Sequence, residues 1–176
     1  MVGRSITRRA SMDIIIDGYN LIGSEQGLQG ALEHKRNWLV QQLSRYQKLK
    51  PFNLIVVFDG WRAGSASEAS EKIAGLSVIY SRLGEKADQV IVRIAREKGT
   101  GAVVVSSDRE IRNAVERFGA VAIHAGEFNQ ILKSIDGVGF EDDVGDDDFV
   151  SDKRGNPNRL GKAERKRIDK LRRLKL

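Results

Sequence analysis

Cysteine is absent from this chain of 176 residues, and histidine occurs only twice, as His34 and His124. Disulfides and thiolate metal sites are therefore excluded. A metal site would have to rely on oxygen ligands, which favours Mg²⁺ or Mn²⁺. The chain also lacks any apolar run near the roughly 20 residues that a membrane-spanning helix needs.

A signal-peptide pattern is missing as well. Residues 1–11 are basic, but Asp13 and Asp17 interrupt the segment after them, so no long apolar stretch succeeds the basic residues. We therefore expect a cytoplasmic protein whose residues 1–11 form a basic, disordered leader.

Charge is distributed unevenly along the chain, whose net charge is +6. Residues 12–135 hold 16 basic and 14 acidic residues, and we predict a single folded domain there. Residues 136–150 hold seven acidic residues and no basic one, which is typical of a flexible acidic linker. Residues 151–176 hold 11 basic and three acidic residues and predict a basic helical tail from Gly161 onward. The excess of basic charge favours an anionic partner, either nucleic acid or an anionic membrane surface.

The basic tail has two interpretations. Its apolar residues are few, which disfavours insertion into a membrane. Lysine and arginine at this density bind phosphates, so we expect the tail to dock on RNA, with ribosomal RNA as one candidate. The alternative is that the tail folds back onto the acidic linker and screens the active site.

Within the predicted domain, short apolar runs alternate with helical patterns. The runs that predict strands are residues 14–16, 54–58, 76–80, 102–105 and 121–123. Apolar residues at helical spacing occur around 32–46, 90–95, 111–118 and 126–133, and residues 61–72 predict a loop or a weak helix. The alternation is typical of an α/β fold with a central, mostly parallel sheet of about five strands flanked by helices.

Three of the predicted strands lead into an aspartate: Asp17, Asp59 and Asp108. In a parallel sheet the carboxyl ends of the strands lie along one edge, where ligands bind. Asp88, just before the helix that leads to the fourth strand, can face the same crevice. Carboxylates gathered there repel one another unless a cation lies among them. Each aspartate alone is more often a turn residue or a helix cap, so the pattern by itself leaves both interpretations open.

Other kinds of phosphate chemistry find less support. The chain has no GxxxxGK[ST] loop and no GxGxxG motif after the first strand, which excludes a P-loop NTPase and leaves a dinucleotide-binding fold unsupported. A receiver domain would need an acidic pair at the end of the first strand, whereas Asp17 is followed by Gly18-Tyr19-Asn20.

The stretch IIIDGYNLI at residues 14–22 closely resembles the opening of the YacP-like NYN domain family. Later motifs match in the same order: VVFDG at 56–60, IYS at 79–81 leading to EKAD at 85–88, and VSSD at 105–108. The resemblance covers about residues 12–133. It implies a PIN-like three-layer nuclease fold and Mg²⁺- or Mn²⁺-dependent endoribonuclease activity, with some relatives acting on mRNA at the ribosome.

The resemblance also implies roles for individual residues. Asp17, Asp88 and Asp108 match the acidic metal-site positions of the family, and Asp59 is the expected fourth member. Asn20 and Ser106 match polar positions that help to hold the metal or its water.

Cations and aromatic residues near these motifs are candidates for RNA contacts. Trp61 is a candidate for stacking on bases, whereas Tyr19 and Trp38 are expected to pack in the core, and His34 and His124 to serve structure or surface. For each single cation, a solvated surface charge is the simpler interpretation. The candidate RNA-binding cations are Arg62, Arg82, Lys86, Arg109 and Arg112 near the sheet edge, and Lys162, Arg165, Lys166 and Arg167 in the tail.

These residues support three functional hypotheses. The first is a metal-dependent RNA endonuclease, which the presence of all four aspartates favours. The second is an RNA- or ribosome-binding module with a weak or inactive metal site. The third, a structure-specific nuclease acting on DNA, ranks last because the sequence has no clear DNA-reading helix.

Overall fold

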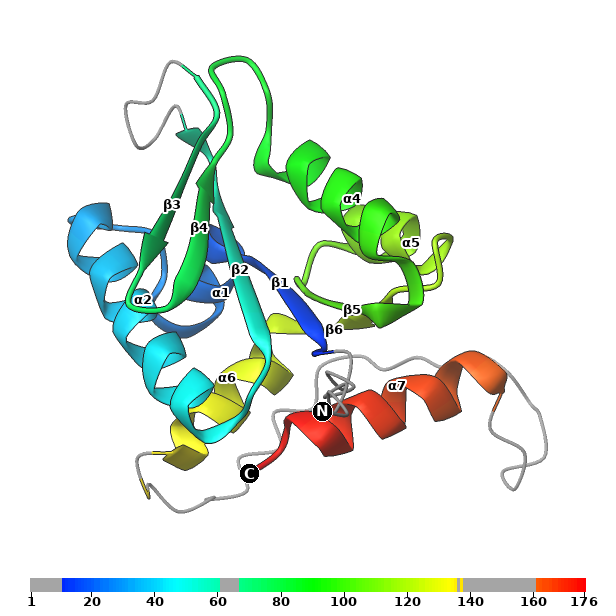
Figure 1. The fold of residues 1–176 in the computed structure, drawn as a ribbon. Coiled ribbons are helices and arrows are strands. Elements are labelled where there is room, and N and C mark those ends of the chain that lie inside the picture. Colours follow the sequence, from blue (N-terminus) through cyan, green and yellow to red (C-terminus); the bar gives the residue numbers. More distant parts are fainter. Residues whose placement is uncertain (1–10, 61–66, 136, 138–160) are drawn as a thin grey trace, which may run out of the picture.

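The computed structural model describes residues 11–60, 67–135, 137 and 161–176. Its centre is a six-stranded sheet in the order β3-β4-β2-β1-β5-β6 (Figure 1). The pairs β1–β2, β1–β5, β2–β4 and β5–β6 are parallel, and the edge strand β3 is antiparallel to β4. The strands are β1 (Asp13–Asp17), β2 (Asn53–Phe58), β3 (Ala69–Ile73), β4 (Leu76–Tyr80), β5 (Ala102–Val105) and β6 (Val121–Ile123). The mostly parallel α/β sheet predicted from the sequence is confirmed.

Helices cover both faces of the sheet, which makes three layers (Figure 1). One layer holds α1 (Gly18–Gln26), α2 (Leu32–Leu49) and α6 (Ala125–Ile135), and the other holds α4 (Ala87–Lys98) and α5 (Arg109–Glu116). A short 3₁₀ turn at Gly99–Gly101 precedes β5, and α7 (Lys162–Leu174) ends the described chain.

The two faces of β1 show how the sequence divides the core. Successive side chains of a strand point to opposite faces, so Ile14 and Ile16 face one side and Ile15 faces the other. Ile14 and Ile16 belong to the larger buried cluster beneath α1, α2 and α6, whereas Ile15 packs with residues of α4 and α5. All three are fully buried, which explains why this strand is an unbroken apolar run rather than an alternating one.

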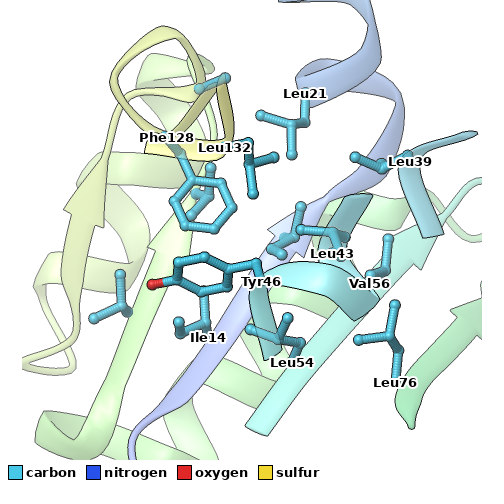
Figure 2. Close-up of a cluster of buried hydrophobic side chains, with 14 of the residues drawn as sticks. Ile14, Leu21, Leu39, Leu43, Tyr46, Leu54, Val56, Leu76, Phe128 and Leu132 are labelled. Carbon is cyan, nitrogen blue, oxygen red and sulfur yellow. The ribbon is translucent and has the colours of Figure 1, made fainter. Parts of the chain in front are cut away.

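The larger cluster is built around two aromatic rings. Tyr46 of α2 and Phe128 of α6 meet edge to face, with their ring centroids 5.5 Å apart (Figure 2). Ile14 and Leu54 from the sheet lie in the same cluster. These contacts fix α2 and α6 against each other and against the middle of the sheet.

Two elements differ from the sequence-based expectation. Residues 69–73 form the edge strand β3, although residues 61–72 were expected to be a loop or a weak helix. Its residues are largely polar and exposed, so it has no apolar pattern that would reveal it. It forms a hairpin with β4 through Ala74 and Gly75, both at positive φ, as a two-residue turn requires. The second addition is α1, which begins directly after Asp17, where the sequence left a turn and a helix cap both open.

The basic helix expected after Gly161 is present as α7, but it packs on the domain instead of standing apart. Leu174 is fully buried in the larger core cluster, and Leu171 packs against that cluster. The helix also contacts the edge strand β6. Within the described ranges, no helix combines the length and the apolarity that crossing a membrane requires.

Candidate active site

The three central strands bring their aspartates to one edge of the sheet. Asp17 is the last residue of β1, Asp59 follows β2 directly, and Asp108 lies three residues beyond β5. Because β2, β1 and β5 are adjacent and parallel, these residues lie at the same end of neighbouring strands. Asp88, in the first turn of α4, approaches from the helix layer. The predicted gathering of carboxylates is thus a feature of the fold.

Asp17 is the most buried of these carboxylates, with 8% of its surface exposed. The pKa of Asp17 is raised from 3.8 to about 7, chiefly by burial and further by the charges of Asp88 and Asp59. Hydrogen bonds from the backbone N–H of Asn20 and the hydroxyl of Ser106 act in the opposite direction but only partly offset it. The folded chain therefore holds Asp17 where its negative charge is unfavourable.

The pKa of Asp88 is raised by the same kinds of interaction. Burial raises the pKa of Asp88, and the neighbouring charges of Asp108 and Asp59 raise it further. Asp17 is thus repelled by Asp88 and Asp59, and Asp88 is repelled by Asp108 and Asp59. Such a group is stabilised by a bound cation.

Three of the aspartates also cap helices. Oδ1 of Asp17 accepts a hydrogen bond from Asn20 N (3.4 Å) at the start of α1, and Oδ1 of Asp108 accepts from Glu110 N (2.7 Å) at the start of α5. Oδ1 of Asp59 accepts from Ala87 N (2.7 Å), the first residue of α4. Capping and metal binding do not exclude each other here, because each of these contacts uses only Oδ1.

Asn20 and Ser106 connect the ends of β1 and β5. The Ser106 hydroxyl donates to Oδ2 of Asp17 (3.2 Å) and accepts from the backbone N–H of Asp108 (3.1 Å). The Asn20 Oδ1 accepts from Ser107 N (2.8 Å). In this structure both side chains hold the carboxylate-bearing segments together, which sets the spacing of Asp17 and Asp108.

Gly18 explains why a glycine must follow Asp17. A Cβ atom at this position would lie 2.3 Å from Cε1 of Phe58, so no side chain fits. Tyr19 packs edge to face on the same Phe58 ring at 5.0 Å, and its hydroxyl accepts from Arg36 (2.8 Å). Tyr19 therefore packs in the core, as expected, as does Trp38, which packs against the larger cluster.

The donor set suits a hard divalent cation, but it is not a closed protein cage. In the part of the chain that the structure describes, no three His, Asp or Glu side chains are gathered closely enough to hold a metal ion on their own. Mg²⁺ retains several water ligands and commonly binds only one or two carboxylates directly. The mutual repulsion around Asp17 and Asp88 therefore fits an ion held partly through water.

Sequence reasoning missed three side chains at this edge. Ser81 is fully buried after β4, and its hydroxyl accepts from Gly60 N (3.0 Å), which ties the end of β2 to β4. Ser107 contacts His124, with Oγ and Nδ1 3.3 Å apart. Ser81 and His124 directly follow β4 and β6, and Ser107 is the second residue after β5. Their partners are distant in sequence, so no local pattern identifies these contacts.

The expected RNA-binding cations near this edge differ in accessibility. Lys86 and Arg109 are exposed, and exposed Arg82 forms an ion pair with Glu85 (3.4 Å). Arg112 is half-buried, and its Nε has no hydrogen-bond partner among the described residues. Arg62 and the possible stacking residue Trp61 lie outside the described residues.

In α7 the expected RNA-binding residues differ in exposure and in their contacts. Lys162 and Arg165 are exposed. Lys166 instead donates to the carbonyl of Gly119 (3.0 Å), and Arg167 binds the carboxylate of Glu127 (2.6 Å). The last two therefore hold the helix to the domain.

Known proteins share this architecture. The chain is 29% identical over 133 residues to the uncharacterized protein YacP of Bacillus subtilis, covering 71% of this chain and 78% of that protein. A crystal structure of Rae1 (YacP) from Bacillus subtilis is 26% identical, with a TM-score of 0.57 and coverage of 70% of this chain and 75% of that one. A mutant of the same protein superposes with a TM-score of 0.59 at 24% identity, over 72% of this chain and 77% of that one, and supports the fold.

The sequence profile of the YacP-like NYN domain matches residues 14–173, a range that includes all four aspartates and nearly all of α7. NYN domains are generally nucleases and typically use divalent metals, which supports a nuclease-type role. With the match extending over most of its length, the chain belongs to the YacP-like NYN domain family.

Proposed function

We propose that this protein is a divalent-metal-dependent endoribonuclease, with Asp17, Asp88, Asp108 and Asp59 as the metal site. The observation that carries the proposal is the buried carboxylate of Asp17, whose pKa is raised to about 7 by burial and by neighbouring carboxylates. Carboxylates with raised pKa values cluster at functional sites, and a bound cation would offset the repulsion among them.

The residues at the sheet edge fit metal-assisted hydrolysis of a phosphodiester bond. A bound Mg²⁺ or Mn²⁺ would supply charge stabilisation at the scissile phosphate and a more acidic water as nucleophile. Asp17 and Asp108 are spaced by Ser106, which contacts both residues, and by Asn20. No side-chain nucleophile is needed, so we expect hydrolysis to leave a 5′-phosphate.

Basic residues around the edge are the proposed contacts for the RNA backbone. Arg82, Lys86 and Arg109 are exposed there, and Lys162 and Arg165 are exposed on α7. Phosphate contacts of this kind supply affinity without reading sequence. We propose cytoplasmic RNA as the substrate, with mRNA on the ribosome as one form in which it is presented.

The test is cleavage of a mixed-sequence single-stranded RNA with Mn²⁺ or Mg²⁺. The wild-type protein is compared with Asp17→Asn and with an EDTA control. Cleavage that both controls abolish, with 5′-phosphate ends, supports the proposal. Products ending in 2′,3′-cyclic phosphates would contradict it.

A second candidate function is an RNA- or ribosome-binding module with a weak metal site. It is favoured by one observation: no three acidic or histidine side chains of the described residues are close enough to hold a metal on their own. RNA binding without cleavage, by a protein that also fails to bind Mn²⁺, would establish it.

A further inference from the structure

Helix α7 is attached to the domain by polar contacts as well as by its buried leucines. The Tyr46 hydroxyl donates to the carbonyl of Leu174 (2.9 Å), and Lys166 Nζ donates to the carbonyl of Gly119 (3.0 Å). Arg167 makes the third contact, where its Nη2 approaches both carboxylate oxygens of Glu127. Lys166 and Arg167 are adjacent in sequence but bind different parts of the domain.

Glu127 makes a second contact at the start of α6. Its Oε2 accepts from the backbone N–H of His124 (3.2 Å), the residue that precedes the helix. The Nδ1 of His124 in turn accepts from the backbone N–H of Gly126 (3.2 Å). This reciprocal arrangement satisfies two backbone donors and fixes His124. Arg167 therefore binds the carboxylate that holds His124 in place.

His124 is connected to the candidate active site through Ser107 and Asn20. Because Nδ1 accepts from Gly126 N–H, it carries no proton, and the Ser107 hydroxyl 3.3 Å away is the donor in that contact. The backbone N–H of Ser107 donates to Oδ1 of Asn20 (2.8 Å), and the backbone N–H of Asn20 donates to Oδ1 of Asp17 (3.4 Å). Ser107 also lies between Ser106 and Asp108, both part of the site.

We propose that Arg167 is a positioning residue for the active site, acting through Glu127 and His124 on Ser107 and Asn20. The contacts run from α7 across the ends of β6, β5 and β1, which are neighbours in the sheet. Arg167 thus helps to set where Asp17 and Asp108 stand relative to each other. The expected effect on cleavage rests on the proposed function, whereas the effect on the site's geometry does not.

The adjacent residues Arg167 and Lys166 provide a matched pair. Arg167→Met and Lys166→Met each remove one polar anchor of α7 and keep an unbranched apolar stem. Only the first removes the partner of Glu127. Arg167→Lys is the rescue variant, because an ammonium group restores the charge toward Glu127 but lacks the second nitrogen that pairs with Glu164.

Three readouts are measured on the full chain: backbone amide NMR shifts, Mn²⁺ affinity, and kcat and KM on single-stranded RNA. For Arg167→Met we expect shifted amide signals for His124, Ser107 and Asn20, and a Mn²⁺ affinity or kcat lower by about 10-fold, the lower range for outer partners of a metal site. KM should change less than twofold, Arg167→Lys should recover part of the loss, and Lys166→Met should leave Ser107 and Asn20 unshifted.

His124 provides an independent test should loss of Arg167 loosen α7. In His124→Asn the amide oxygen can stand near the position of Nδ1 and accept from Ser107, whereas His124→Leu removes the acceptor. We expect the leucine variant to lower Mn²⁺ affinity or kcat more than the asparagine variant, at equal helix content.

The proposal is overturned if Arg167→Met and Lys166→Met give equal changes, because Arg167 would then only anchor α7. It is also overturned if the shifts stop at α6, or if the two His124 variants behave alike. Failure of the proposed function is a different result: wild-type protein would cleave no RNA with either metal, while the amide shifts of Ser107 and Asn20 would still decide the positioning role.

Discussion

The acidic sheet edge, formed by Asp17, Asp59, Asp88 and Asp108, and the basic helix α7 both concentrate charge of one sign. At the sheet edge, burial and like charges raise the pKa of Asp17 and of Asp88. On α7, Arg167 faces the domain and is paired with Glu127. The charge of Arg167, which lies against the domain, is thus neutralised by Glu127. At the sheet edge the carboxylates repel one another, and folding alone does not require that repulsion.

This contrast separates a structural charge from a functional one. If it is correct, changing a carboxylate at the edge should cost activity rather than stability. Changing the buried leucine of α7 should cost stability, and changing the exposed cations of α7 should affect only binding to an anionic partner. The expected effects decrease in that order.

The largest effect is expected from Asp17→Asn. Loss of the central carboxylate charge should lower kcat for RNA cleavage by roughly 10³-fold, the scale seen when one strong electrostatic contact to a transition state is removed. Asp13→Asn, at the opposite end of the same strand, is the matched control and should retain activity. Equal losses in both variants would show that general damage to β1, not the site, is responsible.

The next effect concerns the inward face of α7. Leu174 is fully buried, so Leu174→Ala should lower the free energy of unfolding by roughly 2–5 kcal/mol through lost burial and an incompletely filled cavity. Leu176, 55% exposed and two residues on, is the control, and Leu176→Ala should change stability little. Denaturant unfolding of both variants measures the difference. A negligible loss in Leu174→Ala would mean that α7 does not belong to the cooperative fold.

How far the sequence predicts the fold depends on whether an element is buried. β1, β2 and β5 are apolar runs that local pattern identifies. β3 is a polar edge strand defined by its pairing with β4, and α1 begins at an Asp-Gly step that equally suits a turn. In both cases long-range contacts decide between local structures that the sequence alone leaves open.

The candidate site divides in a similar way. The aspartates are visible in the sequence because each follows a strand, and parallel pairing then brings them together. Arg167 gives no such signal, since it ends a run of three basic residues and its partner Glu127 is 40 residues away. The packing of α7 rests on Leu171 and Leu174, two leucines in a largely charged helix. So sparse a pattern does not specify what the helix packs against.

A smaller effect is expected in the dependence of stability on pH. Because the pKa of Asp17 is raised from 3.8 to about 7 in the folded chain, the folded state binds more protons than the unfolded chain between those values. The stability that the protonated Asp17 side chain contributes to the folded state is fully present below pH 3.8 and is lost as pH rises through about 7. At pH 8, Asp17→Asn should therefore be more stable than wild type, on the order of 1–3 kcal/mol.

Thermal unfolding of wild type and Asp17→Asn across pH 4–8 measures this effect. The two proteins should differ less near pH 4 and diverge as pH rises. Mn²⁺ at millimolar concentration should raise the wild-type Tm at pH 8 and narrow the gap, because a ligand that binds only the folded state stabilises it. A wild type that stays the more stable protein at pH 8 would contradict the raised pKa.

The smallest effect is expected from the exposed cations of α7. Lys162 and Arg165 are exposed there, and Lys162→Gln with Arg165→Gln should leave stability within about 0.5 kcal/mol. If both contact RNA phosphates, the slope of log K against log salt should fall by roughly 0.7 per lost contact with a single strand. Lys48→Gln on the exposed side of α2 is the control for the one charge lost in each single variant, Lys162→Gln or Arg165→Gln. An unchanged slope would mean that α7 serves the domain through its inward face alone, and that RNA affinity comes from the cations around the acidic edge.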